Sequence, residues 1–324
     1  MKRIAALTLA ILSAVCLLAG GASAELSEVR VGTLKFGTVN WELGVIADGL
    51  DRKHGFALKP VVLADNDATS VALLSGDVDA IVTDWIWVAK QRSLGRDYTF
   101  VPYSRSVGAL MVDPKKGFKT ITDLKGHSIG VAGGATNKNW LLLEAYARNA
   151  GFDLAKEADI QFAAPPVLNE LLVRGKLDAV ANFWNFNARL EQQGMVPLLT
   201  VAGILPQLGL KQPPPLIGWV FSEKWADANP TLAKGLIAAS TEAKHALQTD
   251  DGVWLKLRPK MDADNDALFE ALKAGYRAGI PARYGPEDVE AAKTAFKLMH
   301  DVDPASVAGL DALPEGTFWP SYWP

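Results

Sequence analysis

Cysteine and clustered histidine are missing from most of this sequence. Its single cysteine, Cys16, lies in an N-terminal segment with the features of a leader. Its four histidines, His54, His127, His245 and His300, are scattered and form no His-x-His or His-Glu-x-x-His pattern. The chain after the leader therefore has no thiolate nucleophile, no disulfide and no cysteine-based metal site, and a transition-metal centre is not expected.

Signatures of enzymes and of nucleic-acid binders are also lacking. Gly126-His-Ser-Ile-Gly130 has Gly-x-Ser-x-Gly spacing, but its serine begins the expected strand 128–131 and does not stand between a strand and a helix as a catalytic serine would. The run 130–134 lacks the full Gly-x-Gly-x-x-Gly spacing of a dinucleotide site. The formal charge of −3 becomes −5 when the leader, which holds two basic and no acidic residues, is removed. Because lysine and arginine are not clustered, we expect no nucleic-acid partner. We also expect no enzymatic activity, no cofactor and no bound metal.

The leader covers residues 1–24. Its first residues are basic, residues 4–18 are apolar, and Ala22-Ser23-Ala24 is a small-residue cleavage motif. The apolar run is too short for a membrane span, and Val15 precedes Cys16 where a lipid-attachment motif needs a smaller residue. We therefore predict cleavage after Ala24 and export of a soluble protein to the bacterial periplasm.

One ten-residue sequence pattern occurs twice, as Gly76–Trp85 and again as Gly175–Trp184. Each copy follows a Leu-Leu pair and reads Gly, any residue, an aliphatic residue, Asp-Ala, four further residues and Trp. The glycine is typical of a helix C-terminus, and the apolar runs 80–82 and 179–181 predict strands buried on both faces. Polar and aromatic residues then stand at the carboxyl ends of these strands, where open α/β sheets bind ligands. The repeat predicts two similar lobes that face each other across a cleft.

The predicted fold class is α/β, with two lobes that are each a mostly parallel sheet flanked by helices. We expect residues 25–111 and 215–324 to form lobe I and residues 112–214 to form lobe II, with the first crossing near 110–113. The run Lys211-Gln-Pro-Pro-Pro215 is stiff and is expected to belong to the return crossing. Strands are expected at 29–34, 56–63, 80–82, 100–112 with a break at Gly108, 128–131, 160–163, 179–181, 195–201 and 216–221, and helices at 41–54, 85–93, 230–249, 253–258, 267–278 and 286–300.

The order of several short motifs resembles that of a known family. The motifs are Gly32-Thr-Leu-Lys-Phe-Gly37, Leu73-Leu-Ser-Gly-Asp-Val-Asp-Ala80, Ile121-Thr-Asp-Leu-Lys-Gly126, Gly133-Gly-Ala-Thr136 and the second Asp-Ala copy. Their order is similar to that of the substrate-binding proteins of bacterial ABC importers, in the nitrate/sulfonate/taurine branch that includes binders of thiamine-precursor pyrimidines. The resemblance covers nearly the whole chain after the leader. It implies the two-lobed periplasmic-binding-protein fold, a small-molecule ligand between the lobes, and an inner-membrane permease with a cytoplasmic ATPase as partner. We expect a monomer.

The resemblance also places five loops at the cleft, namely 36–41, 83–87, 133–137, 182–185 and the region of Trp219. The candidate ligand-binding residues are Phe36, Asn40, Trp41, Asp84, Trp85, Trp87, Gly134, Thr136, Asn137, Asn182, Trp184, Asn185 and Trp219.

The residue types in these loops indicate the chemistry of the ligand. The turn 133–137 leads into a helix, so its N–H groups and the helix dipole suit an anion. However, the five loops contain no arginine, and Asp84 would repel an anion. The tryptophans favour a flat ring or a cation. We therefore expect a small aromatic molecule or an amine-bearing zwitterion, with a sulfonate-like ligand still open.

Other interpretations remain open at the same residues. Trp85 or Trp87 could pack in the core, and Asp84 could only cap the helix 85–93. Asp79 and Asp178 occupy equivalent places, which favours a structural turn role, and Lys35 and Lys138 could be solvated surface residues. Two further classes of protein are kept as alternatives. One is a binder of a hard metal ion or metal chelate through Glu42, Asp65, Asp67 and Asp84, and the other is an enzyme on the same fold that acts on a small aromatic precursor.

Overall fold

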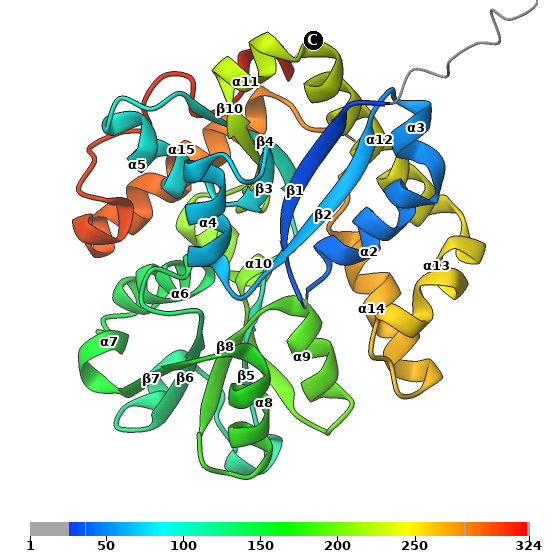
Figure 1. Ribbon diagram of the computed structural model, residues 1–324. Coiled ribbons are helices and arrows are strands. Elements are labelled where there is room, and N and C mark those ends of the chain that lie inside the picture. Colours follow the sequence, from blue (N-terminus) through cyan, green and yellow to red (C-terminus); the bar gives the residue numbers. More distant parts are fainter. Residues whose placement is uncertain (1–25, 36, 282, 323–324) are drawn as a thin grey trace, which may run out of the picture.

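Two five-stranded mixed sheets organise the chain, and helices flank both (Figure 1). The computed structural model describes residues 26–35, 37–281 and 283–322. The strand orders are β2-β1-β3-β10-β4 in the first sheet and β7-β6-β8-β5-β9 in the second. In each sheet the first three strands are parallel, and the fourth runs antiparallel to both of its neighbours. The expected fold class, two α/β lobes with mostly parallel sheets, is confirmed.

The strands of the two sheets have equivalent places in the two lobes. Those of lobe I are β1 (Glu28–Leu34), β2 (Ala57–Leu63), β3 (Ala80–Thr83), β4 (Tyr98–Ser104) and β10 (Ile217–Ser222). Those of lobe II are β5 (Ala109–Val112), β6 (Ser128–Ala132), β7 (Asp159–Ala163), β8 (Ala179–Asn182) and β9 (Val196–Thr200).

Helices of lobe I come from both ends of the described chain. They are α2 (Val39–Val45), α3 (Asp51–Lys53), α4 (Asn66–Ser75), α5 (Trp85–Ser93), α11 (Glu223–Ala228), α12 (Pro230–Thr249), α13 (Asp251–Leu257), α14 (Asp266–Ala278) and α15 (Pro286–Val302). Those of lobe II are α6 (Lys138–Asn149), α7 (Leu154–Glu157), α8 (Pro165–Val173), α9 (Trp184–Glu191) and α10 (Val201–Ile204). Within the described residues, no helix combines the length and the apolar character needed to span a bilayer.

Two expected elements are broken by glycine. The expected helix 41–54 is interrupted after α2 by a π-helical turn, Ile46–Leu50, in which Gly49 has φ 113°. The strand expected at 100–112 with a break at Gly108 is two strands in different sheets, β4 ending at Ser104 and β5 beginning at Ala109. Gly108 itself lies so close to lobe II that a Cβ on it would be 2.0 Å from the carbonyl oxygen of Asn182. The chain leaves the first sheet after Ser104 and enters the second at β5, a few residues before the expected crossing. The lobe boundaries themselves remain a prediction.

The duplicated Asp-Ala pair has the same structural role in both lobes. The backbone N–H of Arg30, at the start of β1, donates to Asp79 Oδ2 (2.7 Å), and the N–H of Asp79 donates back to the Arg30 carbonyl (2.8 Å). In lobe II the N–H of Ser128 donates to Asp178 Oδ2 (3.0 Å), and the N–H of Asp178 donates to the Ser128 carbonyl (3.0 Å). The structural role inferred for these two aspartates is confirmed.

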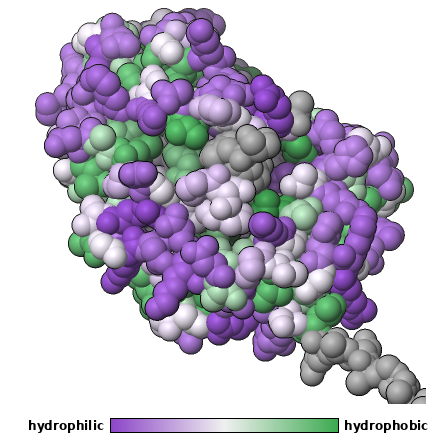
Figure 2. All heavy atoms as spheres, turned by 90° about the horizontal axis from the view of Figure 1, so that it is seen from above, coloured by the Kyte–Doolittle hydropathy of each residue, from purple (hydrophilic) through white to green (hydrophobic). Residues whose placement is uncertain are grey.

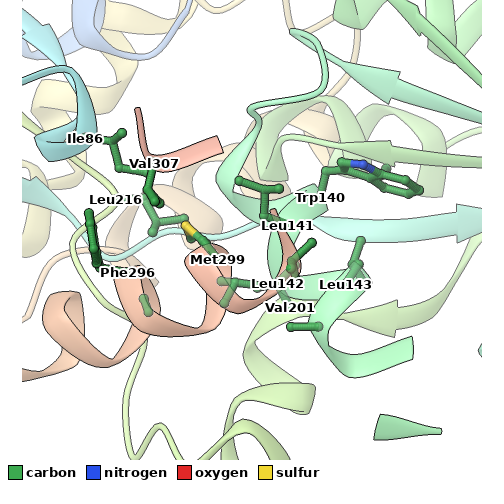
Figure 3. Close-up of a cluster of buried hydrophobic side chains, with 14 of the residues drawn as sticks. Ile86, Trp140, Leu141, Leu142, Leu143, Val201, Leu216, Phe296, Met299 and Val307 are labelled. Atoms are coloured by element: carbon green, nitrogen blue, oxygen red, sulfur yellow. The ribbon is translucent and has the colours of Figure 1, made fainter. Parts of the chain in front are cut away.

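Apolar side chains join the two lobes along one flank. Figure 3 shows where α15 of lobe I lies against α6 of lobe II, with Met299 between Phe296 and the leucines of α6. Leu141 and Leu142 of α6 are at most 2% exposed. Separating these two helices would expose this apolar surface to water, so the contact stabilises the arrangement of the lobes. On the remaining outer surface seen in Figure 2, hydrophilic residues dominate and the hydrophobic ones lie in small separate groups.

Asp288, in the first turn of α15, joins the two segments that cross between the lobes. Its side chain is fully buried. Its Oδ1 accepts hydrogen bonds from Arg105 Nε (2.8 Å), in the first crossing, and from Gln212 Nε2 (3.3 Å), in the return crossing. Its Oδ2 accepts the N–H of Gly285 (2.8 Å), which caps α15. One carboxylate therefore fixes both crossings against the start of one helix.

We predict that Asp288→Asn lowers the free energy of unfolding by about 3 kcal/mol, because it leaves the largely buried guanidinium of Arg105 without a charged partner. Urea unfolding measures this change. The matched control is Asp123→Asn, since Asp123 also accepts capping hydrogen bonds, from Lys119 and Thr120, but lies away from the crossings. The control is expected to cost about 1 kcal/mol. Equal losses in the two variants would contradict the crossing-segment role of Asp288.

A buried glutamate on α6 predicts a dependence of stability on pH. Burial raises the pKa of Glu144 to about 7, and Asp153 and Asp303 act in the same direction while Arg148 opposes them. A carboxyl whose pKa is raised on folding stabilises the fold below its unfolded value, near 4.5, and this stabilisation is lost as the pH rises through about 7. Glu144→Gln removes the titration.

The expected result is that Glu144→Gln and the unchanged protein have similar free energies of unfolding at pH 5, and that the variant is more stable by about 2 kcal/mol at pH 8. Urea unfolding of both proteins at the two pH values measures the difference. All other ionisable groups are common to the pair, so the change in the difference reports Glu144 alone. A difference that is the same at both pH values contradicts the prediction.

Candidate functional site

Loops at the carboxyl ends of the central strands bring the two lobes into contact. Lys138, at the start of α6, places its Nζ 2.7 Å from Asp84 Oδ2, at the end of β3 in lobe I. Trp184, at the start of α9, packs edge-on against Trp41 of α2, with ring centroids 6.2 Å apart. We call the region around Asn40, Trp41, Asp84, Asn137, Lys138 and Trp184 the inter-lobe site. The strand ends predicted to face each other do so here.

Asp84 is held by two interactions. Its Oδ1 accepts the N–H of Trp87 (2.8 Å) and so caps α5, which satisfies one free donor of the helix start. Its Oδ2 accepts from Lys138 Nζ across the lobes (2.7 Å). The two side chains are 20% and 17% exposed, so water screens the pair only in part. Capping, expected as an alternative to a site role, occurs together with an inter-lobe ion pair.

The loop before α6 is shaped by two glycines and one asparagine. Gly133 and Gly134 have φ of 78° and 110°, which side chains other than glycine rarely adopt. Asn137 Oδ1 accepts the N–H groups of Asn139 (2.8 Å) and Trp140 (3.2 Å), and its Nδ2 donates to Ala132 (2.7 Å). Asn137, not Thr136, is therefore the N-cap of α6, and its amide serves the backbone. Thr136 is exposed and Gly134 is half-buried.

Aromatic side chains surround Trp41 on the lobe I side of this site. Trp41 is 4% exposed and lies among Trp184, Trp254 and Tyr276, at ring-centroid distances of 6.2, 6.0 and 5.9 Å. Trp184 is half-buried and lies over Gly275 of α14, where a Cβ would come within 2.7 Å of its ring. The glycine thus allows a tryptophan of lobe II to lie flat against a helix of lobe I.

A buried network of ionic and hydrogen-bonding groups fixes the aromatic side chains around Trp41. Glu42 is fully buried, and its Oε2 accepts from Lys244 Nζ (2.6 Å) and Tyr276 Oη (3.0 Å). Its Oε1 accepts from Ser240 Oγ (2.5 Å), which also accepts from Trp219 Nε1 (2.9 Å). Burial raises the pKa of Tyr276 well above its usual value, and the charge of Glu42 adds to this effect. Tyr276 therefore stays a neutral donor that fixes its ring beside Trp41.

Three predicted site residues are core residues, which corrects the expectation for them. Trp85 is fully buried, and its Nε1 donates to the carbonyl of Pro215 (3.0 Å). Trp219 is 1% exposed and uses its Nε1 on Ser240. Asn182 is 2% exposed, with its Nδ2 donating to Pro165 and Asn169. Their polar atoms are satisfied inside the protein, so none of them presents a group to a ligand in this structure.

The geometry of α5 explains why Trp85 and Trp87 have different surroundings, with Trp85 in the core position that was left open for it. The helix expected at 85–93 is present as α5. Trp85 and Trp87 both lie on this helix, where residues two apart point in different directions. Trp85 then points into the core, and Trp87 is half-buried against Tyr98, with ring centroids 5.2 Å apart.

Asn40 has a loop-forming role at the site. Its Nδ2 donates to the carbonyl of Leu34 (2.8 Å), and its Oδ1 accepts from Thr33 Oγ1 (2.8 Å), so it closes the turn between β1 and α2. Asn185 is half-buried in the first turn of α9. Phe36 and the predicted leader lie outside the described residues. Ligand contacts by the remaining candidates, Trp41, Trp87, Gly134, Thr136, Trp184 and Asn185 among them, stay a prediction.

The carboxylates considered for a hard metal ion do not converge. Asp65 caps α4 by accepting the N–H of Ala68 (2.8 Å), Asp84 pairs with Lys138, and Glu42 pairs with Lys244. Among the residues that the structure describes, no group of three or more His, Cys, Asp or Glu side chains is placed to hold a metal ion. Two surface hollows of about 340 and 270 Å³ lie elsewhere, since no residue of the inter-lobe site lines them.

Sequence reasoning missed two further residues of this site. Lys138 was not among the candidate site residues and a solvated surface position was left open for it, although its place beside a predicted helix start was a signal of its proximity to the cleft. Lys244 lies 202 positions from Glu42, and no local pattern indicates that they pair.

Comparison with solved structures supports the same architecture. The alkanesulfonate-binding protein SsuA from Xanthomonas axonopodis pv. citri, bound to MOPS, superposes with a TM-score of 0.71 at 18% identity, covering 92% of this chain and 99% of that one. The periplasmic aliphatic sulphonate binding protein SsuA from Escherichia coli gives 0.69 at 18% identity, with 90% and 97% covered. The periplasmic nitrate-binding protein NrtA from Synechocystis PCC 6803 gives 0.59 at 12% identity, with 91% and 93% covered. At these identities the likeness establishes the fold.

Sequence comparison identifies the family. No curated protein matches the chain. The model of the NMT1-like family matches residues 22–253, which is most of the sequence. The motif order noted above already resembled the nitrate/sulfonate/taurine branch of substrate-binding proteins, and the fold agrees with it. The chain therefore belongs to the NMT1-like family.

Proposed function

We propose that this protein is the periplasmic solute-binding component of an ABC importer, which captures a small organic molecule between its lobes. It delivers the molecule to an inner-membrane permease driven by a cytoplasmic ATPase. The observation that carries this proposal is the meeting of equivalent strand-end loops from two similar lobes at the inter-lobe site. Family membership and the leader motif at residues 1–24 support the same function.

The character of the inter-lobe site supports an organic ligand. Trp184 and Trp87 are half-buried, so each offers part of a ring to a neighbouring molecule. The charge of Asp84 is balanced by Lys138, and the start of α6 carries the positive end of a helix dipole. A flat or zwitterionic molecule with one hydrogen-bonding end fits this combination better than a bare cation.

Capture requires that the lobes separate and close again. Two chain segments connect the sheets, one between Ser104 and Ala109 and one between Thr200 and Ile217. Few connections between two packed units are typical of hinge closure around a ligand. The contact of Trp184 with α14 belongs to the closed arrangement, because the tryptophan and the helix come from different lobes.

The function predicts that the protein carries its ligand when purified from its native periplasm under non-denaturing conditions. Mass spectrometry of small molecules released by denaturation identifies it. The released compound, added back at 100 times its Kd, is expected to stabilise the protein by about 2.7 kcal/mol, which thermal unfolding detects. The proposal fails if nothing is released and if aromatic acids, amines, zwitterions and sulfonates all leave the melting temperature unchanged. Conversion of the compound to a product would indicate an enzyme instead.

The contact at Gly275 predicts a variant that favours the open arrangement. Gly275→Ala is expected to separate α9 from α14, since the new Cβ would lie 2.7 Å from the Trp184 ring. Alanine otherwise favours a helix by about 1 kcal/mol over glycine, so the variant should still fold. Small-angle X-ray scattering is expected to give a larger radius of gyration. The control is Gly275→Ala with Trp184→Leu, which makes room for the Cβ and should restore the compact value. An unchanged radius in the single variant contradicts the assignment of this contact to closure.

A further inference from the structure

The ion pair between Asp84 and Lys138 carries information about the ligand. This ion pair links the strand ends of one sheet to those of the other. Both of its side chains are about four-fifths buried. Its members come from different lobes, Asp84 from the end of β3 and Lys138 from the first turn of α6. The pair therefore forms when the lobes meet and breaks when they part.

Lys138 is placed where an anion would otherwise be attracted. It combines a cationic side chain with the N-terminal end of α6, a helix of twelve residues whose dipole also favours negative charge. In this structure a carboxylate of the protein itself takes the place of that anion, at 2.7 Å from Lys138 Nζ.

The carboxylate of Asp84 is fixed in this place. Its Oδ1 is bound to the N–H of Trp87, so the orientation of the group follows from the start of α5. Because this hydrogen bond restricts rotation of the carboxylate, its Oδ2 is directed at Lys138. An anionic ligand group beside Lys138 would have to displace Asp84, leaving a partly buried carboxylate without its cation and next to a like charge.

We propose that Asp84 is a specificity-determining residue that excludes simple anions from the inter-lobe site, so that the ligand class is uncharged or zwitterionic. This inference rests on the proposed binding function. An uncharged molecule leaves the ion pair intact when the lobes close, and a zwitterion can bring its own cation to Asp84. A sulfonate or an oxyanion without a compensating cation does neither.

The test compares two probes of matched shape, butane-1-sulfonate and its neutral analogue butane-1-sulfonamide, by isothermal titration calorimetry. The variants are Asp84→Asn, which keeps a capping oxygen but removes the charge, and Asp84→Asn combined with Lys138→Gln. Asp84→Ser replaces Asp84→Asn if the latter does not fold, because serine also caps helices. The matched control is Asp65→Asn, since Asp65 caps α4 in the same manner and pairs with no cation in the described structure.

The expected result is that Asp84→Asn binds butane-1-sulfonate at least tenfold more tightly than the unchanged protein. The second substitution, Lys138→Gln, should abolish this gain, and Asp65→Asn should leave the affinity unchanged. The affinity for butane-1-sulfonamide should differ little between the unchanged protein and Asp84→Asn.

The inference is overturned if the unchanged protein already binds the sulfonate as tightly as Asp84→Asn does, or if Asp84→Asn fails to bind it. In both cases the binding function stands as long as a small molecule is released from the native protein. Only the absence of any released or bound molecule removes the proposed function together with the inference.

Discussion

The position of every site residue depends on how the first strand of each lobe is paired. Asp79 and Asp178 clamp the starts of β1 and β6 by accepting one backbone N–H each and donating their own. The clamp fixes the register in which Val31 lies opposite Ala80 in lobe I and Ile129 opposite Ala179 in lobe II. A slip by one residue would turn every side chain to the other face of the sheet. With the register fixed, the helices that follow the paired strands begin at one edge of each sheet.

A second constraint joins the helices on the lobe I side of the site. The Glu42–Lys244 pair ties α2 to α12, and the hydroxyl of Tyr276 adds α14. Removing one member of such a buried network leaves an uncompensated charge, which is costly, so the three helices form one body. Trp41 and Tyr276 are part of that body. Trp184, by contrast, is held to lobe II by the chain and to lobe I only by packing.

The fold could be predicted from the sequence because the same ten-residue pattern, at 76–85 and 175–184, occurs in both lobes. The repeat contains a helix stop, a buried strand and the clamping aspartate, all within ten residues, and these local signals do not depend on distant contacts. The repeat also placed Asp84 at the end of β3, where the structure has it. Trp85 and Trp219 were misplaced because their burial depends on the packing of remote segments, the return crossing at Pro215 and the helix that carries Ser240. The side-chain partners of Glu42 and Asp288 lie more than 70 residues away, and pairing at such distances leaves no mark in a single sequence.

The antiparallel strand of lobe I has a consequence for the order in which the protein can fold. Strand β10 pairs with both β3 and β4, so these two strands have no partner between them until residues 217–222 are available. By then the chain has passed through all of lobe II. Contacts between such distant segments form slowly, because a long loop must close first. Lobe II, whose strands all lie between residues 109 and 200, can therefore be completed before lobe I, although lobe I begins first in the chain.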